Sequence, residues 1–515
     1  MKLNYKRTIL VGFAFFLISA FWQAYDATIP VILTNKFGMS QAWSGVIMAL
    51  DNILAVFMLP LFGALSDKCT SKSGKRTPFI RFGTIVAAVA LFGLAFVDDI
   101  QLTNINMVSE IDSEKALYEI YDTQGDKTLM TPEGEQFVLK DKYTLEEFVS
   151  IRSDYIDEET GESPYTNYVA PARQAYAAER TAANPKALIA FVILLFILLV
   201  SMATFRSPAV ALMPDVTIKP LRSKANAIIN LMGTAGGILV LVLGIVFATS
   251  AVRNQLMNYY IYYGIIAALM LVALGIFLAT VREPQWAKEM QQESVHLGIE
   301  EDVENNDEKR SLSKSEKCSL IFILASIALW YMGYNAVTSK YSVYAGNILN
   351  MDYNTTLLLA QAAAIVAYLP AGMVASKIGR KKTILAGVIM LTTAFGAASF
   401  LRAGSSVIVM NILFALAGIG WATINVNSFP MVVEMCSGGD VGKYTGFYYT
   451  ASMSAQIITP MFSGFLMDMD GIGMTILFPY AAVFAGLAFV TMMLVKHGDA
   501  KPEAKKGLEA MDIDD

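Results

Sequence analysis

Long apolar runs separated by short polar segments dominate this chain. A helix that crosses a bilayer needs about 20 apolar residues, because no backbone group can stay unpaired in hydrocarbon. Twelve runs approach or exceed this length, which predicts an all-α membrane protein with twelve transmembrane helices. The predicted helices cover residues 8–33, 44–65, 82–97, 187–214, 225–250, 259–281, 319–346, 355–376, 383–401, 406–432, 444–467 and 473–495.

The first run follows Lys2, Lys6 and Arg7, an arrangement that is also found in secretory signals. It is longer than the apolar region of a signal peptide, which spans about 7–15 residues. It also contains Asp26 and Pro30 and lacks a clear small-residue cleavage site. We therefore predict that it is retained as the first helix.

The composition supports a membrane protein and argues against an enzyme. Hydrophobic residues make up 55% of the 515 residues and charged residues only 16%, against about 25% charged in soluble domains. Cys69, Cys318 and Cys436 have no metal-binding spacing and are not expected to form disulfides. His296 and His497 lie outside the apolar runs, and no nucleophile with a base or phosphate loop occurs. We predict no catalytic activity, cofactor or metal.

Basic residues are concentrated in alternate connections between the predicted helices. The connections at 68–81, 219–224 and 377–382 are rich in Lys and Arg. Short cytoplasmic loops keep such residues, whereas short outside loops do not. We therefore predict a multi-pass protein of the cell (plasma) membrane with both termini in the cytoplasm.

The two parts of the chain carry related segments. Residues 21–27 resemble residues 330–336 at an offset of 309, and Leu59-Pro60 recurs as Leu369-Pro370 at about the same offset. Internal repeats of this kind are typical of transporters. The repeat predicts two pseudo-symmetric six-helix bundles.

A long insertion interrupts the first half. Asp215 matches Glu434 at an offset of only 219, so about 90 extra residues precede Asp215. Residues 98–186 contain 19 acidic and 8 basic side chains and no spanning run. The predicted topology places them outside the cell, either as a small folded cap or as a largely disordered segment. We expect a solvated elaboration without chemistry of its own. The predicted domains are residues 1–281 for the first half, 282–317 for a charged cytoplasmic linker, 318–497 for the second half and 498–515 for a charged cytoplasmic tail.

Six plus six helices with a Gly/basic turn after the second and eighth resemble the major facilitator superfamily. The first turn runs from Gly63 through Gly74-Lys75-Arg76 and includes Asp67. The second copy, residues 372–381, is shorter and has no residue equivalent to Asp67. The resemblance implies a substrate site near the bilayer midplane between the halves. It also implies access that alternates as the halves rock.

Within that superfamily the chain resembles the glycoside-pentoside-hexuronide:cation symporters and the sucrose symporters. Residues 74–79 are similar to their Gly-basic-basic-x-Pro signature, and residues 207–215 to the sucrose-type end of the fourth helix. The positions of the sodium-site carboxylates of melibiose-type relatives hold Ala55 and Leu59, and Leu199 occupies the middle of the fourth helix, where sucrose symporters have a carboxylate. The resemblance therefore does not identify the ion to which transport by this chain would be coupled.

Charges inside the predicted helices are candidates for function, because each costs at least about 2.5 kcal/mol at the bilayer centre. Asp26 and Asp51 are the ion-coupling candidates, with a purely structural hydrogen-bonding role as the alternative. Arg206 suits carboxylates or sugar hydroxyls, or it braces Asp51 or Asp215. Lys340, at a depth similar to Asp26, either influences that carboxylate or extends to the outer surface.

A second set of charges lies at the predicted cytoplasmic helix ends. Ion pairs there would close the cytoplasmic side and release when the halves rock, or they would be permanent structural pairs. The gate candidates are Asp67, Lys75, Arg76, Asp215, Arg380, Lys381 and Glu434.

Aromatic and amide side chains inside the helices are candidates for sugar contacts. Sugars need flat apolar surfaces for their ring faces and neutral hydrogen-bonding groups for their hydroxyls. Any single aromatic residue also fits the interfacial belt, which suits Trp43 best. The substrate-binding candidates are Trp22, Gln23, Tyr25, Arg206, Tyr334, Asn335, Lys340, Gln361, Trp421, Asn425, Tyr448, Tyr449 and Gln456.

These patterns predict a secondary active transporter with alternating access, a proton-coupled symporter of a sugar or glycoside, namely a di- or oligosaccharide. The alternatives are a transporter of another solute, such as an exporter or lipid flippase, and a non-transporting membrane receptor. The expected partners are a small-molecule sugar, H+ as the coupling cation and the lipid bilayer. No nucleic acid is expected, and the chain is expected to act as a monomer.

Overall fold

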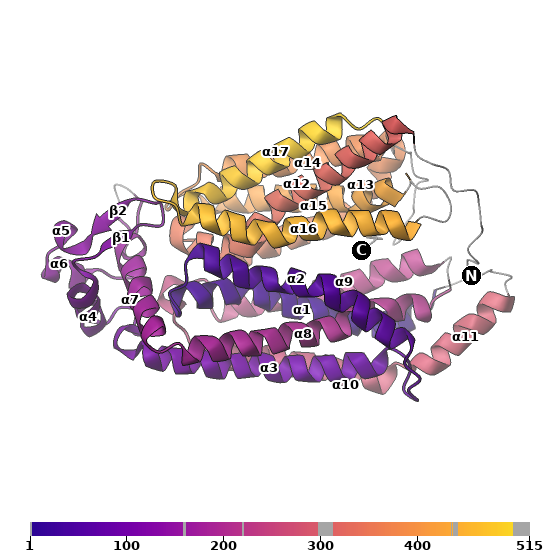
Figure 1. Ribbon diagram of the computed structural model, residues 1–515, viewed down its shortest axis with the longest axis horizontal. Coiled ribbons are helices and arrows are strands. Elements are labelled where there is room, and N and C mark those ends of the chain that lie inside the picture. Colours follow the sequence, from indigo (N-terminus) through magenta and orange to yellow (C-terminus); the bar gives the residue numbers. More distant parts are fainter. Residues whose placement is uncertain are drawn as a thin grey trace.

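The computed structural model is an elongated bundle of two six-helix halves with a small cap at one end (Figure 1). It describes residues 3–157, 161–218, 221–296, 313–433, 435 and 441–497. The first half contains α1 (Tyr5–Asn35), α2 (Gln41–Asp67), α3 (Thr77–Asn104), α8 (Lys186–Asp215), α9 (Arg222–Val246) and α10 (Tyr260–Thr280). The second half contains α12 (Lys314–Tyr344), α13 (Tyr353–Ile378), α14 (Arg380–Ala398), α15 (Val407–Val433), α16 (Val441–Met467) and α17 (Leu477–Met493). The predicted fold class is confirmed.

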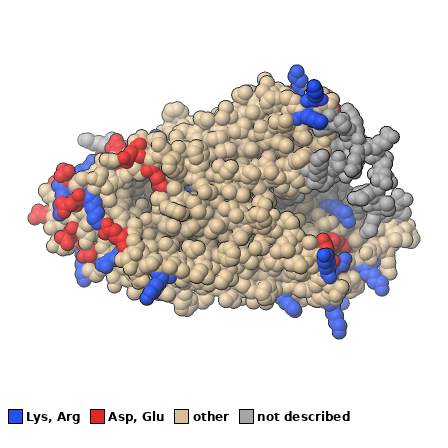
Figure 2. Space-filling view, in the orientation of Figure 1, with Lys and Arg blue, Asp and Glu red and all other residues tan. Residues whose placement is uncertain are grey.

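Most of these helices are apolar enough to cross a membrane unaided. Ten described helices meet that condition by length and composition. Helices α13 and α16 pack against the opposite half, α13 on α9 and α16 on α2. In the face shown in Figure 2, charged side chains gather at the two ends and the middle is almost free of them.

Polar side chains set the starts of several helices. Ser40 accepts a hydrogen bond from the Trp43 N–H at the start of α2. Ser313 and Glu316 form a reciprocal capping box at the start of α12. Asp352 accepts from the N–H groups of the first turn of α13. These caps satisfy donors that have no partner within the helix.

The contacts between the halves follow the sequence repeat. Helix α2 corresponds to α13 and α9 to α16 in the two bundles, and the main helix pairs across the halves are α2 with α16 and α9 with α13. On α2, an added methyl at Gly45 would overlap the carbonyl oxygen of Pro460 on α16. An added methyl at Gly464 would overlap the Gln41 backbone in the same way. The two backbones therefore touch directly at this crossing.

The inserted segment folds as a cap, which is one of the two alternatives left open by the sequence. Helix α3 continues past the predicted end at residue 97 to Asn104, so the cap begins later than expected. Seventeen buried residues form a core of its own, including Val252 and Leu256 from the connection between α9 and α10. The elements of the cap are η1 (Asn106–Val108), α4 (Glu114–Gln124), β1 (Thr128–Met130), β2 (Gln136–Val138), α5 (Leu139–Lys142), α6 (Leu145–Ser150), η2 (Tyr165–Val169) and α7 (Ala170–Ala183).

We call the end of the bundle that carries residues 105–185 the cap side and the opposite end the terminal side. The connecting elements on the cap side are η4 (Val252–Asn254), η5 (Ala345–Leu349) and η6 (Gly473–Ile476). Helix α11 (Glu283–His296) occupies the start of the predicted linker on the terminal side (Figure 1). The rest of that linker up to residue 312, and the predicted tail, lie outside the described residues.

A fully buried ion pair lies beneath the cap. The Lys36 ammonium, directly after α1, donates to both Asp98 carboxylate oxygens at 2.7 and 2.6 Å and to the Met257 carbonyl at 2.7 Å. It also lies 4.6 Å from the centre of the Tyr259 ring. Three acceptor oxygens and one aromatic ring therefore surround an ammonium group that has lost its water.

Candidate substrate and coupling site

Aromatic residues from three helices of the second half form one cluster. Tyr334 of α12 stacks on Trp421 of α15, with ring centres 3.7 Å apart and planes 5° apart. Tyr331 meets the same indole edge-on at 5.2 Å, and its hydroxyl lies 3.3 Å from the Tyr448 hydroxyl of α16. Tyr334 and Trp421 are only half-buried. The cluster therefore combines flat apolar rings with hydroxyl groups.

A second aromatic group lies on α1 in the first half. Trp22 packs edge-on against Phe21 and Tyr25, with ring centres 5.0 and 5.5 Å apart. The Arg206 guanidinium of α8 lies 5.8 Å from the Trp22 ring centre, within cation–π range. Two candidates that the sequence named separately, Trp22 and Arg206, are thus in contact.

An amide pair joins the halves through the middle of the bundle. The Gln361 side chain of α13 donates from Nε2 to Oε1 of Gln23 on α1. Gly237 of α9 lies beside them, since a Cβ there would be 3.3 Å from Gln361 Oε1 and 3.8 Å from Gln23 Oε1. The helices of both halves therefore place neutral hydrogen-bonding groups at the same point.

The two intramembrane carboxylates influence each other. The Asp26 carboxylate lies in the electrostatic field of Asp51, and Asp51 lies in that of Arg206. Asn52 donates from Nδ2 to Asp51 Oδ1 at 2.8 Å. Within the described part of the chain, the Asp26 carboxylate has no hydrogen-bond partner. A carboxylate in that setting reduces its electrostatic cost by binding a proton or a cation.

Lys340 has a different position from the one expected. Its ammonium is fully buried and donates to the Gln41 carbonyl oxygen at 2.6 Å, and Asp468 is the carboxylate that acts on it electrostatically. It neither extends to the outer surface nor pairs with Asp26 in this conformation. Similar depth on related helices did not imply contact, because Lys340 points across the interface to the start of α2.

The remaining substrate candidates have individual environments. Asn335 donates to the Tyr331 carbonyl oxygen one turn earlier at 2.9 Å. Tyr25 is buried, and among the described residues its hydroxyl has no partner. Three more candidates, on the helices that carry Trp421 and Tyr448, are half-buried: Asn425, Tyr449 and Gln456.

The halves are closed against each other on the cap side. Asp468 of the second half accepts from the Gln41 and Ala42 N–H groups at 2.8 and 2.7 Å, so it caps α2 of the first half. Ser250 donates to Asp352 at 2.6 Å across the α9–α13 contact. Burial opposes ionisation of Asp352, but the hydrogen bonds from Ser250 and Thr355 outweigh it and lower its pKa.

The halves separate toward the terminal side. Six residues between Gln41 and Ala49 of α2 are buried, but beyond them only Ala55 and Ser66 are. Helices α2 and α16 lie side by side near the cap and diverge toward the other end (Figure 1). The surface is recessed between the halves there (Figure 2). The conformation is closed on the cap side and open toward the terminal side.

The predicted gate residues on the terminal side pair within a half. Arg76 binds Asp67 at 2.5 Å and Asp215 at 2.8 Å, which ties together α2, α3 and α8. Burial alone would lower the pKa of Arg76, but Asp215 and Asp67 raise it. Lys381 donates to the Met493 and Val495 carbonyl oxygens at the end of α17. In this conformation these contacts are therefore structural pairs within each half.

The other gate candidates have different positions. Lys75 is exposed, and Arg380 opens α14 within the second half. Glu434 lies outside the described residues.

Glu283 at the start of α11 is a member of the Arg76 site that the sequence did not indicate. Its carboxylate accepts from the Arg76 and Thr77 N–H groups, each at 2.8 Å, and so caps α3. Gly74 has a φ of 113° and packs against this carboxylate, so a side chain there would collide with it. The Gly/basic turn therefore has room for the carboxylate of Glu283, which follows α10.

Two helical halves that close on one side around interior aromatic, amide and carboxylate groups define a membrane transporter. The chain belongs to the family described as the MFS_1 like family, whose model matches residues 9–480, within the major facilitator superfamily. The predicted superfamily is confirmed.

Similarity to curated relatives is local. The chain is 35% identical to the sucrose transport protein SUC4 of Arabidopsis thaliana over 80 residues, 16% of each protein. It is 40% identical to SUC3 of the same plant over 71 residues, which are 14% of this chain and 12% of that protein. The match therefore spans less than a fifth of either relative.

Solved structures share the fold along nearly the whole chain. The inward open xylose transporter XylE from E. coli has a TM-score of 0.57 at 15% identity and covers 99% of both chains. A peptide transporter POT in complex with sulfate has a TM-score of 0.59 at 10% identity, covering 95% of this chain and 93% of that chain. Since these transporters carry different substrates on one fold, the fold alone does not define the substrate.

Proposed function

We propose that this protein is a secondary active transporter that carries a sugar or glycoside by alternating access and couples it to protons. The observation that carries the proposal is the stacked Tyr334–Trp421 pair beside hydroxyls in one half, with the Gln23–Gln361 amide pair joining the halves. Pyranose rings pack on such aromatic faces, and amides bond to hydroxyls in both donor and acceptor roles. Trp22 and Arg206 supply a second wall.

Proton coupling is assigned to Asp26 and Asp51. Each lies on a first-half helix whose repeat mate carries an amide instead, Asn335 and Gln361. The negative charge of Asp51 acts on the Asp26 carboxylate, and a proton bound between the two removes this repulsion. Among the described residues, Asp51 has a hydrogen bond from Asn52 and a positive neighbour in Arg206, whereas Asp26 has neither, so Asp26 is the better candidate for the proton that travels with substrate.

The positive-inside rule places the terminal side in the cytoplasm and the cap outside the cell. The conformation described above is then inward-facing. The Lys340–Gln41 and Asp468–α2 contacts serve as the extracytoplasmic gate, and they must break when the halves rock to face outward.

The local similarity to sucrose transport proteins supports a sugar substrate, while the peptide transporter and the nucleoside transporter NupG (TM-score 0.53) share the fold. Transport therefore has to be measured. Purified protein in liposomes is expected to accumulate at least one labelled glycoside from a mono-, di- and oligosaccharide panel when the outside is more acidic. A protonophore is expected to abolish the accumulation. If soundly folded protein shows neither uptake nor counterflow of any sugar, the sugar assignment is wrong.

Replacing Trp421 tests the aromatic surface. Trp421→Ala removes the stacking partner of Tyr334 and is expected to raise KM about tenfold, which corresponds to about 1.4 kcal/mol of lost contact. Trp421→Phe should retain most of the affinity. Trp43→Ala is the matched control, since that indole is 63% exposed at the start of α2. Equal KM values for the two alanine variants would remove Trp421 from the substrate site.

A further inference from the structure

The cap is fixed to the first half by buried contacts. Val252 and Leu256, from the connection between α9 and α10, lie within the apolar core of the cap. Gln174 of α7 donates to the side chain of Asn35, at the end of α1, at 2.8 Å. The cap therefore moves with the first half as one body.

The same cap reaches the second half through the loop of its β-hairpin and the first residue of β2, residues 131–136, which we call the hairpin tip. The Met474 N–H donates to the Pro132 carbonyl oxygen at 2.7 Å, and the Gly471 N–H donates to that of Gly134 at 2.8 Å. A side chain at Gly134 or Gly473 would overlap the opposing backbone. The fit between the hairpin tip and the loop after α16 is therefore close and involves main chain on both sides.

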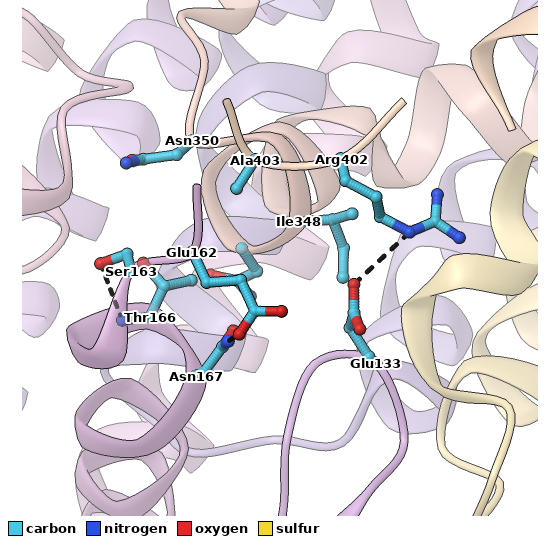
Figure 3. Close-up of a pocket in the computed structure, with 10 residues that line it drawn as sticks. Glu133, Glu162, Ser163, Thr166, Asn167, Ile348, Asn350, Arg402 and Ala403 are labelled. Atoms are coloured by element: carbon cyan, nitrogen blue, oxygen red, sulfur yellow. Dashed lines mark hydrogen bonds and ion pairs between the residues drawn. The ribbon is translucent and has the colours of Figure 1, made fainter. Parts of the chain in front are cut away.

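Side chains extend this contact. Gln136 donates to the Asp470 carboxylate, and Arg402, in the connection between α14 and α15, lies 3.4 Å from Glu133 (Figure 3). Burial raises the pKa of Glu133, although Arg402 opposes the change. A pocket of about 210 Å³ remains beside the pair, with Glu162 and Asn167 on the cap wall. This contact is polar and partly open, unlike the apolar core that fixes the cap to its own half.

We propose that the hairpin tip is a latch that holds the cap side closed and releases in every transport cycle. The inference rests on the proposed alternating access, because the halves must then part on the cap side. Since the cap is fixed to the first half, that movement breaks the contacts of the hairpin tip with residues 402 and 470–474 and leaves the Gln174–Asn35 contact intact. The latch stabilises the cap-closed conformation relative to the one that opens toward the cap.

Cross-linking separates a releasing contact from a permanent one. Gln136→Cys and Asp470→Cys are introduced together after Cys69, Cys318 and Cys436 have been replaced by Ser. A short, reducible bifunctional thiol reagent joins the pair. Transport is expected to fall at least about tenfold in the cross-linked protein and to return on reduction, because the halves cannot part on the cap side.

The matched control joins Gln174→Cys to Asn35→Cys, whose side chains have nearly the same lengths and meet in a similar hydrogen bond. Cross-linking this pair is expected to leave transport unchanged. If the cross-linked Gln136/Asp470 pair transports as well as its reduced form, the hairpin tip does not release and the latch is refuted.

A conformational readout needs no substrate, so it distinguishes failure of the latch from failure of the sugar assignment. Gln41→Cys, buried between the halves, reports their separation through its rate of labelling by an impermeant maleimide. Adding Glu133→Ala and Gln136→Ala is expected to speed labelling about fivefold, since two modest polar contacts are lost. Gln174→Ala should leave the rate unchanged. An unaltered rate in the Glu133→Ala/Gln136→Ala protein would overturn the latch, whatever the transported solute.

Discussion

Asp26→Asn is expected to abolish accumulation of substrate while counterflow exchange continues. An inward gradient of about one pH unit supplies about 1.4 kcal/mol per proton, so a one-proton symporter concentrates its substrate up to about tenfold. The amide cannot take up the travelling proton, and the accumulation ratio should fall to about one. Exchange of labelled for unlabelled substrate requires only binding and rocking of the halves and should persist.

Asp99→Asn is the matched control for this variant. Asp99 also lies on a first-half helix, but it is at the cap-side surface, where it accepts from Asn258 at 2.6 Å. The Asp99→Asn protein should accumulate substrate to the same ratio as the unmodified protein. If Asp26→Asn lowers uptake and exchange equally, or leaves accumulation intact, Asp26 is a structural hydrogen-bonding residue and the coupling site lies elsewhere.

Asp98→Ala is expected to cause the largest loss of stability of any single substitution considered. It leaves the Lys36 ammonium fully buried without its carboxylate, which typically costs about 3–5 kcal/mol. The midpoint of thermal unfolding in detergent should fall by on the order of 10 °C. The double replacement Lys36→Met/Asp98→Leu removes both charges. Its midpoint of thermal unfolding should be close to that of the unmodified protein.

The pair between Arg7 and Glu289 provides the comparison. Both side chains are more than one-third exposed, so Glu289→Gln should lower the midpoint of thermal unfolding much less than Asp98→Ala does. Two outcomes would contradict the energetic role of the buried pair. Either the Asp98→Ala and Glu289→Gln proteins unfold at the same temperature, or the double replacement unfolds at as low a temperature as Asp98→Ala.

The twelve helices were predictable because lipid demands long apolar segments whatever their partners. The contacts of α2 with α16 and of α9 with α13 are equivalent by the repeat, but the repeat does not indicate which helices of the two halves meet. Of the interior candidates, Trp22 with Arg206 and Gln23 with Gln361 are brought together by the fold.

Other parts of the site depend on distances that no local pattern contains. Asp98 follows an apolar run, so the sequence assigns it to the solvent-exposed insertion. In the structure it pairs with Lys36, 62 positions away, and α3 continues past it to Asn104. The sequence predicts for Lys340 a depth similar to that of Asp26, whereas its contact with the start of α2 depends on how the halves are docked. Glu283 lies in a charged linker, and its contact with Arg76 and Thr77, more than 200 positions away, is not indicated by the sequence around it.

The crossing of α2 and α16 makes each half behave as a lever. Gly45 and Gly464 let the two backbones touch near the cap side, so while this side stays closed the halves change their angle by turning about this point. From Gly45 to the end of α2 the helix extends about 33 Å, and a rotation of roughly 10° about the crossing would move that end by about 6 Å. A displacement of that size is comparable to the width of a single sugar ring. A small angular change at two glycines is thus enough to admit or release a substrate at the far end.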